Sequence, residues 1–269
     1  MRNGFSILDA HCHVYPEKIA SKAAGATNGF YGIDLAPCEG TVSDLMRLGQ
    51  AAGVDRYLIQ SVATTPKQVA SIHTFIANEV AQDPASLAGL GTFHPDCDDI
   101  AGVVEQILSL GLHGVKIHPD IQRFAVDDPR AMKFYELCEG RLPILIHTGD
   151  RRYDFSNPDR LSRVLDAFPK LAVIGAHFGG WSIWEEASRL LAGRENLWVD
   201  CSSTFYAVPE NKKVEEMISR YGADRVLFGT DYPMWRPDTE LDRFFTLDLS
   251  DEARHLILSE NAKRVYGIE

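Results

Sequence analysis

The sequence predicts an α/β protein folded as a single (β/α)8 (TIM) barrel domain, residues 1–269, and three observations lead to this fold. Eight short apolar runs alternate with longer amphipathic segments, which is the order of a parallel sheet covered by helices. The runs are nearly continuous in Val, Ile and Leu, as in strands buried on both faces. The length of 269 residues is usual for one such barrel.

The expected strands are the apolar runs. They span residues 6–13, 55–63, 87–95, 114–119, 143–150, 171–180, 197–204 and 225–233. A doubly wound open sheet is the alternative, but it requires a glycine fingerprint after its first strand. Gly89 and Gly91 lack the third glycine and precede no helix, so the barrel is favoured.

The expected helices follow the strands. They span residues 41–53, 66–82, 98–111, 129–141, 157–168, 181–191, 209–221 and 250–266. Thr41 or Ser43 opens the first helix, and Ser250 caps the last. Asn157 is an N-cap candidate with Pro158 at the first helical position.

One connection, residues 14–40 between the first strand and the first helix, is far longer than usual. It holds four glycines beside Tyr15, Phe30 and Tyr31. Two interpretations stay open, namely a surface excursion with a small turn of its own, or a lid over the barrel mouth.

Composition excludes several classes of partner. The formal net charge of −11 argues against a nucleic-acid or acidic-membrane surface. No apolar run is long enough to span a membrane, and residues 1–5 offer no signal-peptide core. Five cysteines without a C-x-x-C pair indicate reduced thiols, so we expect a cytoplasmic protein. The oligomeric state, including a homo-oligomer, stays open.

Histidines collect at the expected strand ends. In chain order these ends carry His11 and His13, His94, His118, His147, His177 and Asp231. The carboxyl ends of barrel strands all face one rim, where the active sites of this fold lie. The remaining three histidines are scattered, namely His73, His113 and His255.

The pair His11 and His13 has the two-residue period of a strand, so both side chains point to one side. The same parity places Lys116 with His118, His147 and Asp231 toward the barrel interior. Three imidazoles and a carboxylate suit zinc, manganese or iron(II) with an open position for water. A single buried histidine is usually a hydrogen-bonded core residue, which we expect of His94, whereas a whole group without a ligand would be costly to bury.

A family resemblance rests on an ordered set of motifs. The run ILDAHCH at residues 7–13 resembles the opening motif of the amidohydrolase superfamily. Residues 114–119 (GVKIHP), 146–149 (IHTG), 176–180 (AHFGG), 227–233 (LFGTDYP) and 257–262 (ILSENA) resemble the amidohydrolase-related branch that includes aminocarboxymuconate semialdehyde decarboxylase.

The resemblance implies a distorted TIM barrel with one divalent metal, bound through the positions of His11, His13, His147 and Asp231. Zinc is favoured, with manganese or iron as alternatives. The resemblance also implies that His177 stands beside the metal-bound water as a base or electrostatic partner. Binuclear branches use a carboxylated lysine on the fourth strand. Lys116 lies on that strand but one inward step below His118, so its carboxylation stays open.

Two reactions fit these residues. In a hydrolase the metal lowers the pKa of bound water, and His177 and Asp231 share the proton traffic. In a non-oxidative decarboxylase, the alternative, an acid protonates the carbon that loses carbon dioxide. Hydrolysis is modestly favoured, because Lys116 and His118 add donors for an oxyanion. A non-catalytic metal-binding protein is disfavoured because no ligand is missing, and a serine hydrolase because no G-x-S-x-G occurs.

The expected substrate is a small carboxylate-bearing lactone, amide or ester. Rim loops carry Arg123, Arg151, Arg152 and Arg236, whose guanidinium groups suit a carboxylate unless neighbouring aspartates pair with them. Aromatic residues in the same loops suggest an apolar, planar pocket, namely Phe124, Tyr153, Phe155, Trp181, Trp184, Tyr232 and Trp235. Among these, Trp181 and Trp235 join Lys116, His118 and the arginines at positions 123, 151 and 152 as expected substrate contacts.

Overall fold

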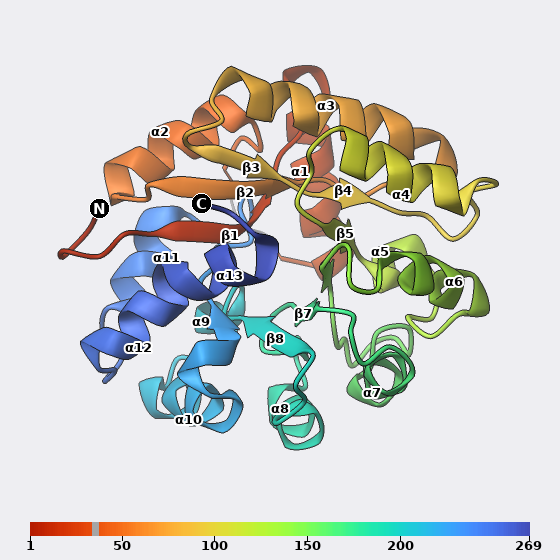
Figure 1. The fold of residues 1–269 in the computed structure, drawn as a ribbon. Coiled ribbons are helices and arrows are strands. Elements are labelled where there is room, and N and C mark those ends of the chain that lie inside the picture. The colour runs from red at the N-terminus through yellow and green to blue at the C-terminus, as the bar shows by residue number, and fades with distance from the viewer. Residues whose placement is uncertain (34–37) are drawn as a thin grey trace.

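The computed structural model, which describes residues 1–33 and 38–269, has a ring of parallel strands surrounded by helices (Figure 1). The strands of the described residues are β1 (Leu8–His13), β2 (Arg56–Gln60), β3 (Leu87–Gly89), β4 (Gly91–Thr92), β5 (Val115–Ile117), β6 (Ile144–Ile146), β7 (Val173–Gly175), β8 (Leu197–Asp200) and β9 (Val226–Leu227). Every expected strand is present, but each is shorter than expected. Most of the polar residues at the expected strand ends therefore lie just beyond the strands.

The strands form two sheets, with the orders β1-β2-β3 and β4-β5-β6-β7-β8-β9. The break falls within the expected strand 87–95. There the N–H of Leu90 bonds to the carbonyl of Ile59 (2.9 Å), whereas the N–H of Gly91 bonds to that of Gly114 (2.9 Å). The backbone therefore switches from one neighbouring strand to the other between Leu90 and Gly91, and this switch interrupts the sheet of the barrel.

The two outer ends of the strand series meet without forming a regular ladder. The N–H of Ala10 on β1 bonds to the carbonyl of Phe228 (3.0 Å), and the N–H of Asp231 bonds to the carbonyl of His11 (2.9 Å). Cys12 and Tyr232 form an isolated parallel bridge. These contacts bring the segment after β9 alongside β1, so the expected barrel is confirmed.

The eight expected helices are present around the ring (Figure 1). They are α2 (Val42–Ala52), α3 (Val69–Gln82), α4 (Ile100–Ser109), α6 (Pro129–Cys138), α7 (Pro158–Ala167), α8 (Trp184–Leu191), α10 (Asn211–Tyr221) and the closing pair α12 (Asp251–His255) and α13 (Asn261–Tyr266). A π-helical turn, Leu256–Glu260, joins the closing pair. Thr41 and Ser250 cap their helices as expected, whereas the Asn157 side chain makes no capping bond.

Four further helices in the described part of the chain were not expected from the sequence. They are α1 (Glu17–Tyr31), α5 (Pro119–Gln122), α9 (Thr204–Ala207) and α11 (Pro237–Phe244). α1 occupies the long connection 14–40, of which residues 34–37 lie outside the described part. Its buried residues are Ala20 and Ala24 alone, and Gly32 ends it in the left-handed conformation. A helix with so little buried surface belongs to no core layer; we call α1 the cap helix.

The barrel interior is apolar at the end where the strands begin. Leu58, Leu145 and Ile174 fill it from the strands, and Tyr266 and Ile268 close it from the C-terminal segment. In Figure 1 the C-terminus lies in front of the strand ring. This plug leaves the histidine-bearing end of the strands for a functional site.

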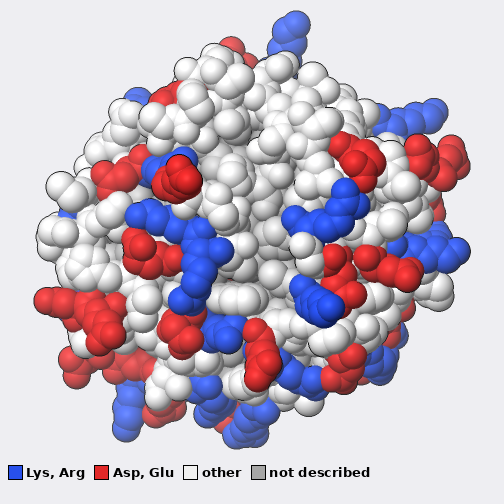
Figure 2. Space-filling view, in the orientation of Figure 1, with Lys and Arg blue, Asp and Glu red and all other residues white. Residues whose placement is uncertain are grey.

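The surface carries charges of both signs. On the face seen in Figure 2, basic and acidic side chains intermingle around a largely uncharged centre. All five cysteines, each among the described residues, are free. In the described part of the chain no helix is long and apolar enough to cross a membrane.

His73, one of the scattered histidines, is a structural residue. It is fully buried on α3; its Nδ1 lies 2.9 Å from Gln106 Oε1, and its Nε2 lies 2.8 Å from the carbonyl oxygen of Thr92. We expect His73→Leu to lower the free energy of unfolding by about 1–3 kcal/mol, because buried polar partners lose their bonds. Urea unfolding at neutral pH measures this, with His255→Leu on the exposed face of α12 as the control. A change as small as that of the control would contradict the assignment.

Candidate functional site

Three expected ligands meet at the carboxyl end of the strands. His11 Nε2 lies 3.2 Å from His13 Nε2 and 3.2 Å from Asp231 Oδ1, and His13 Nε2 lies 3.5 Å from the same oxygen. We call this arrangement the ligand triangle. β1 carries both histidines, and the register of β1 against β2 shifts between Asp9 and Cys12. Asp231 follows β9 in the left-handed conformation, with φ of 60°.

The ligand triangle has the dimensions of a metal site. Ligand atoms about 2.0–2.1 Å from a tetrahedral zinc ion lie about 3.3–3.4 Å apart, close to the three distances found here. Burial is the main cause that lowers the pKa of His13 well below its usual value. A neutral imidazole keeps a nitrogen lone pair for a metal.

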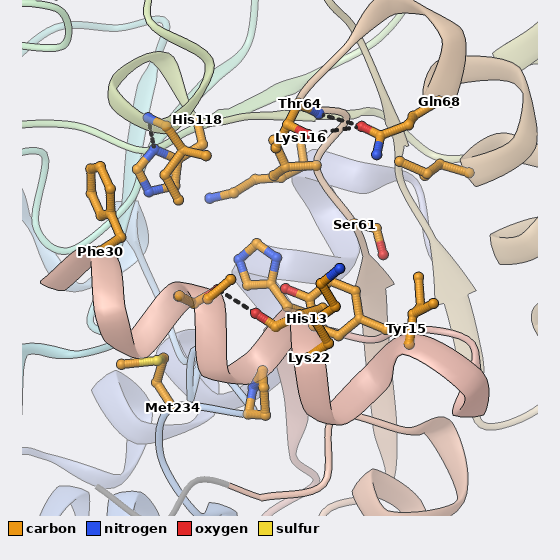
Figure 3. A pocket seen from close by; sticks show the side chains of 18 of the residues that line it. His13, Tyr15, Lys22, Phe30, Ser61, Thr64, Gln68, Lys116, His118 and Met234 are labelled. Carbon is orange, nitrogen blue, oxygen red and sulfur yellow. Dashed lines mark hydrogen bonds between the residues drawn. The ribbon is translucent and has the colours of Figure 1, made fainter. Parts of the chain in front are cut away.

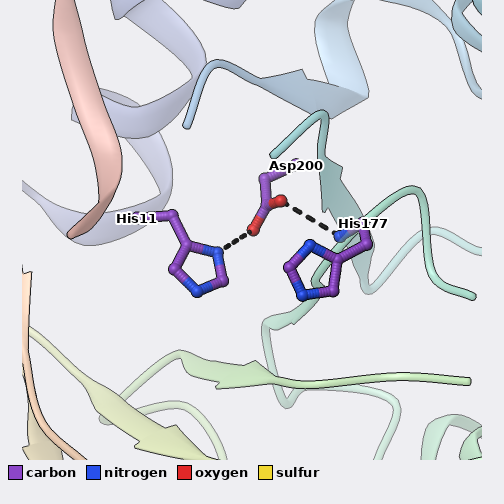
Figure 4. A group of neighbouring side chains, drawn as sticks. All are labelled: His11, His177 and Asp200. Carbon is purple, nitrogen blue, oxygen red and sulfur yellow. Dashed lines mark hydrogen bonds and ion pairs between the residues drawn. The ribbon is translucent and has the colours of Figure 1, made fainter. Parts of the chain in front are cut away.

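Asp200, at the end of β8, contacts both His11 and His177 (Figure 4). Its Oδ2 lies 2.9 Å from His11 Nδ1, and its Oδ1 accepts from the backbone N–H of His177 (3.0 Å) and from Ser202 Oγ (2.5 Å). Burial opposes ionisation, but His11 and these hydrogen bonds hold the pKa of Asp200 below its usual value. The carboxylate therefore keeps a proton on His11 Nδ1 and leaves Nε2 free for the triangle.

Asp200 was not among the residues expected from the sequence, and its role can be tested. We expect Asp200→Asn to weaken the binding of a divalent metal by about 10- to 100-fold, the usual effect of losing such a supporting carboxylate. Competition with a chelating dye measures the affinity. Asp150→Asn is the control, because Asp150 is equally buried but pairs with Arg152. Equal affinities in the two variants would show that Asp200 does not support the site.

His177 lies beside the ligand triangle, its ring stacked on that of His11 at 5.3 Å. Its Nδ1 lies 3.0 Å from the carbonyl oxygen of Ser202, and its Nε2 lies 3.1 Å from His147 Nδ1. Burial lowers the pKa of His177 to about 4. Its φ of 59° places it in a turn after β7 rather than in the expected strand.

His147 and His118 form a second group of buried histidines. Their rings stack in parallel, with centroids 3.8 Å apart. His147 Nε2 lies 3.8 Å from Asp120 Oδ2, and burial raises the pKa of Asp120 to about 7. His118 caps the short helix α5 through its Nδ1, which accepts from the N–H of Ile121 (3.2 Å). The structure thus places His147, the fourth expected ligand, with His118 and Asp120 rather than in the triangle, and its role as a ligand stays a prediction.

Lys116 is fully buried on β5, as its strand parity predicts. Its Nζ lies 3.2 Å from His11 Nε2. Burial lowers the pKa of Lys116 to about 8, and the charges of Asp231 and Asp200 oppose this shift. A basic amino group therefore stands directly beside the ligand triangle.

A cavity of about 650 Å³ opens above these residues. His11, His13, Lys116, His118, His147 and Asp231 lie among its lining residues. Figure 3 shows the cap helix along one side of the cavity and Lys116 and His118 on the other. Apolar side chains from the cap helix, α3 and the segment after β9 complete the walls, among them Ile19, Phe30, Ile72, Phe75 and Met234. The cap helix thus lies over the barrel mouth, which favours the lid interpretation of the long connection.

The rim arginines are not among the cavity's described lining residues, and their role in binding substrate stays a prediction. Arg152 pairs with Asp150 (2.7 Å), and Arg236 pairs with Asp238 (2.8 Å). Arg151 donates to the carbonyl of Ser182 (2.6 Å). Arg123 is exposed at the end of α5. Arg152 and Arg236 thus each pair with an aspartate two residues away in the sequence.

The two expected tryptophans also lie beside the cavity rather than in its lining. Trp181 packs on the ring of Tyr31 at 4.9 Å. Trp235 donates to Ser203 Oγ (2.7 Å), which in turn donates to Asp231 Oδ2 (2.5 Å). Trp235 is therefore linked to the ligand triangle through Ser203, and its contact with a substrate stays a prediction.

Comparison with known proteins identifies the family and the fold. The family model described as amidohydrolase matches residues 8–268. Among similar solved structures is an uncharacterized TIM-barrel protein from Bordetella bronchiseptica, with a TM-score of 0.81 and 23% sequence identity over 98% of this chain and 99% of that one.

Two further structures carry names of activities. One is a dihydroxybenzoic acid decarboxylase from a Polaromonas species with bound manganese and the inhibitor 2-nitroresorcinol (TM-score 0.71, 17% identity, covering 98% of this chain and 97% of that one). The other, from Pseudomonas putida, is proposed to be a 2-pyrone-4,6-dicarboxylic acid hydrolase (TM-score 0.69, 19% identity, covering 98% of each chain). At these identities the likeness establishes the fold alone.

Proposed function

The chain belongs to the amidohydrolase family, and from this premise we propose that it is a divalent-metal-dependent decarboxylase of a small, planar carboxylate. Hydrolysis, which the sequence modestly favoured, becomes the second candidate. The change rests on the site and on the similar structures, most of which are named as decarboxylases of hydroxylated aromatic acids.

His11, His13 and Asp231 are the residues we propose to hold the metal. Two imidazole nitrogens and a carboxylate oxygen suit zinc and manganese alike, and manganese is bound in the Polaromonas decarboxylase. A divalent ion there would polarise a substrate oxygen and stabilise negative charge that develops on it. Asp200 orients His11 for this purpose, and Ser203 orients Asp231.

The observation that carries the decarboxylase proposal is the placement of Lys116. Its ammonium group lies fully buried beside the ligand triangle at the floor of a mostly apolar cavity. Asp231 and Asp200 favour the charged form of Lys116, and we propose that a substrate carboxylate entering the cavity pairs with this buried ammonium group. The apolar walls suit the flat remainder of such a substrate.

The structure weakens the case for hydrolysis. Hydrolysis was favoured because Lys116 and His118 could both donate to an oxyanion. His118 instead has its Nε2 2.7 Å from the hydroxyl of Tyr31. A hydrolase is still supported by the resemblance to the Pseudomonas putida protein.

Loss of carbon dioxide leaves a carbon that must take up a proton from solvent. We propose that His177 and Asp231 pass this proton on. The Nδ1 of His177 faces the carbonyl of Ser202 and so carries a proton, which leaves the lone pair of Nε2 to take up a proton and pass it on. Asp231 keeps one oxygen in the triangle and the other on Ser203.

The test follows products from two panels, with protein loaded with zinc or with manganese. One panel holds hydroxybenzoates and unsaturated dicarboxylates, and the other holds lactones and amides of small carboxylic acids. We expect carbon dioxide release, with solvent deuterium entering the carbon skeleton. Oxygen-18 from labelled water appearing in the product, without carbon dioxide, would establish hydrolysis in its place.

A further inference from the structure

One face of the cap helix forms a wall of the cavity. Six residues at positions i, i+3, i+4, i+7, i+8 and i+11 of this helix line the cavity, and these positions share one helix face. They are Ile19, Lys22, Ala23, Ala26, Thr27 and Phe30. Figure 3 shows Lys22 on the cap-helix side of the cavity and Lys116 on the other. Lys22 is exposed, whereas Lys116 is buried, so two amino groups from separate elements border one cavity.

No carboxylate in this wall pairs with Lys22. Asp231 is the only acidic residue among the cavity's described lining residues, and it belongs to the ligand triangle. Within residues 1–33 and 38–269, Lys22 forms no ion pair. Arg152 differs, because it pairs with Asp150 (2.7 Å) and donates to the carbonyl of Phe30 (2.7 Å), which anchors the end of the cap helix. The ammonium group of Lys22 can therefore bind an anion that enters the cavity.

Gln68 adds a second donor to the cavity lining. It ends the short 3-10 helix Pro66–Gln68, which precedes α3. Its Oε1 accepts from the backbone N–H groups of Thr64 (2.8 Å) and Thr65 (3.1 Å). Because backbone N–H groups can only donate, these two bonds establish which end of the amide is the oxygen. The Nε2 group therefore points the other way, toward the cavity in Figure 3, and bonds to no other described residue.

These two groups offer donors where the cavity has no acidic partner for them. We propose that Lys22 and Gln68 form a second subsite, which binds another anionic group of the substrate, so that the preferred substrate carries two acidic groups. The inference rests on the proposed function only in placing the first carboxylate beside Lys116. Ile72 and Phe75 line the same cavity, which suits the apolar frame that joins two such groups. Lys22 and Gln68 thus determine specificity and take no part in the reaction itself.

Binding of small aromatic acids tests the inference without turnover. Benzoate carries one carboxylate, whereas isophthalate and terephthalate carry a second one at two different distances from the first. Titration calorimetry on the zinc-loaded protein gives the affinity ratio of each dicarboxylate to benzoate. We expect a ratio above one for at least one of them, and we expect it to fall as salt is added, because Lys22 is exposed. A wild-type protein that prefers neither dicarboxylate would overturn the inference.

Substitutions then assign the preference to the subsite. Lys22→Gln should lower the affinity ratio by roughly two- to five-fold, the range for one exposed ion pair. Gln68→Glu should lower it as well, because glutamate keeps an acceptor for Thr64 and Thr65 but replaces the N–H donors with an oxygen. Lys18→Gln and Lys67→Gln should keep the wild-type ratio, since both lysines are exposed but are not among the described lining residues. An unchanged ratio in Lys22→Gln or in Gln68→Glu, or an equal fall in the two controls, would contradict the proposed subsite.

The binding experiment separates this inference from the proposed reaction. Product analysis that showed hydrolysis would leave the affinity ratios, and their fall in Lys22→Gln, unaffected. Carbon dioxide release together with equal ratios in the wild-type and Lys22→Gln proteins would support the decarboxylase and reject the second subsite. With a dianionic substrate that the wild-type protein turns over, Lys22→Gln should raise KM and change kcat much less, because the interaction is the same in the bound substrate and in the transition state.

Discussion

Replacing His11 with alanine is expected to remove the metal and abolish turnover together. His11 Nε2 is the shared corner of the ligand triangle, 3.2 Å from both His13 Nε2 and Asp231 Oδ1. Without His11 only two ligands of the triangle remain. We therefore expect the affinity for the divalent metal to fall by more than roughly 100-fold, the largest usual effect of losing a residue that only supports a ligand. Elemental analysis of the wild-type protein, purified without chelator, should find about one divalent ion per chain.

His73→Leu is the control for this experiment, because it also removes a buried imidazole, but one that is not among the cavity's described lining residues. It should keep its metal and its turnover while losing stability. A folded, active wild-type protein that contains no metal would refute the proposed chemistry. So would a His11→Ala variant that retains one ion with unchanged affinity.

Replacing His177 with asparagine is expected to lower turnover by roughly two to four orders of magnitude, the range for a general acid–base group, while the metal stays bound. Asparagine suits this position because His177 has φ of 59°, and asparagine tolerates the left-handed region. Its amide can still bond to Ser202, but it cannot transfer a proton. The variant therefore removes the proton transfer and keeps the turn.

Metal content and kcat are measured on the same His177→Asn preparation. Loss of the ion would make His177 a ligand, for which the structure offers a plausible group with His11 and Asp200. Retention of both the metal and full turnover would remove His177 from the reaction. A lowered kcat with bound metal separates its role from that of the ligand triangle.

The barrel could be predicted from the sequence because its evidence is local. Strands buried on both faces need continuous apolar runs, and helices between them need caps, as at Thr41 and Ser250. The strand ends were placed too far along the chain. His177 and Asp231 fall within expected strands, yet both adopt the left-handed conformation, because an apolar run does not show where the extended backbone ends.

The sequence did not predict that the cap helix is helical, and the reason is physical. α1 contains Gly25 and Gly29, residues that favour loops in isolation, and it buries only two alanines. Its position depends on distant contacts, chiefly Arg152 and the site histidines. Tyr31 therefore could not be distinguished in the sequence from any other aromatic residue of a glycine-rich loop.

The candidate ligands were predictable in part. The spacing of His11 and His13 and the position of Asp231 place all three at one rim of any barrel, and the structure brings them together. His147 satisfies the same rule but lies with His118 and Asp120. Asp200 was not predicted. It is the last residue of β8, and the expected strand there, residues 197–204, was one of two to which no functional residue was assigned.

The sequence by itself determined the order of strands and helices and the rim at which the histidines gather, since both depend on apolar patterning and strand period. Only the tertiary structure decided which polar groups pair. Arg152 and Arg236 were expected to face substrate, but each has an aspartate two residues away and pairs with it. Lys116 has no such neighbour and lies buried beside His11. Charge pairing depends on distances of a few ångströms between side chains, and folding sets these.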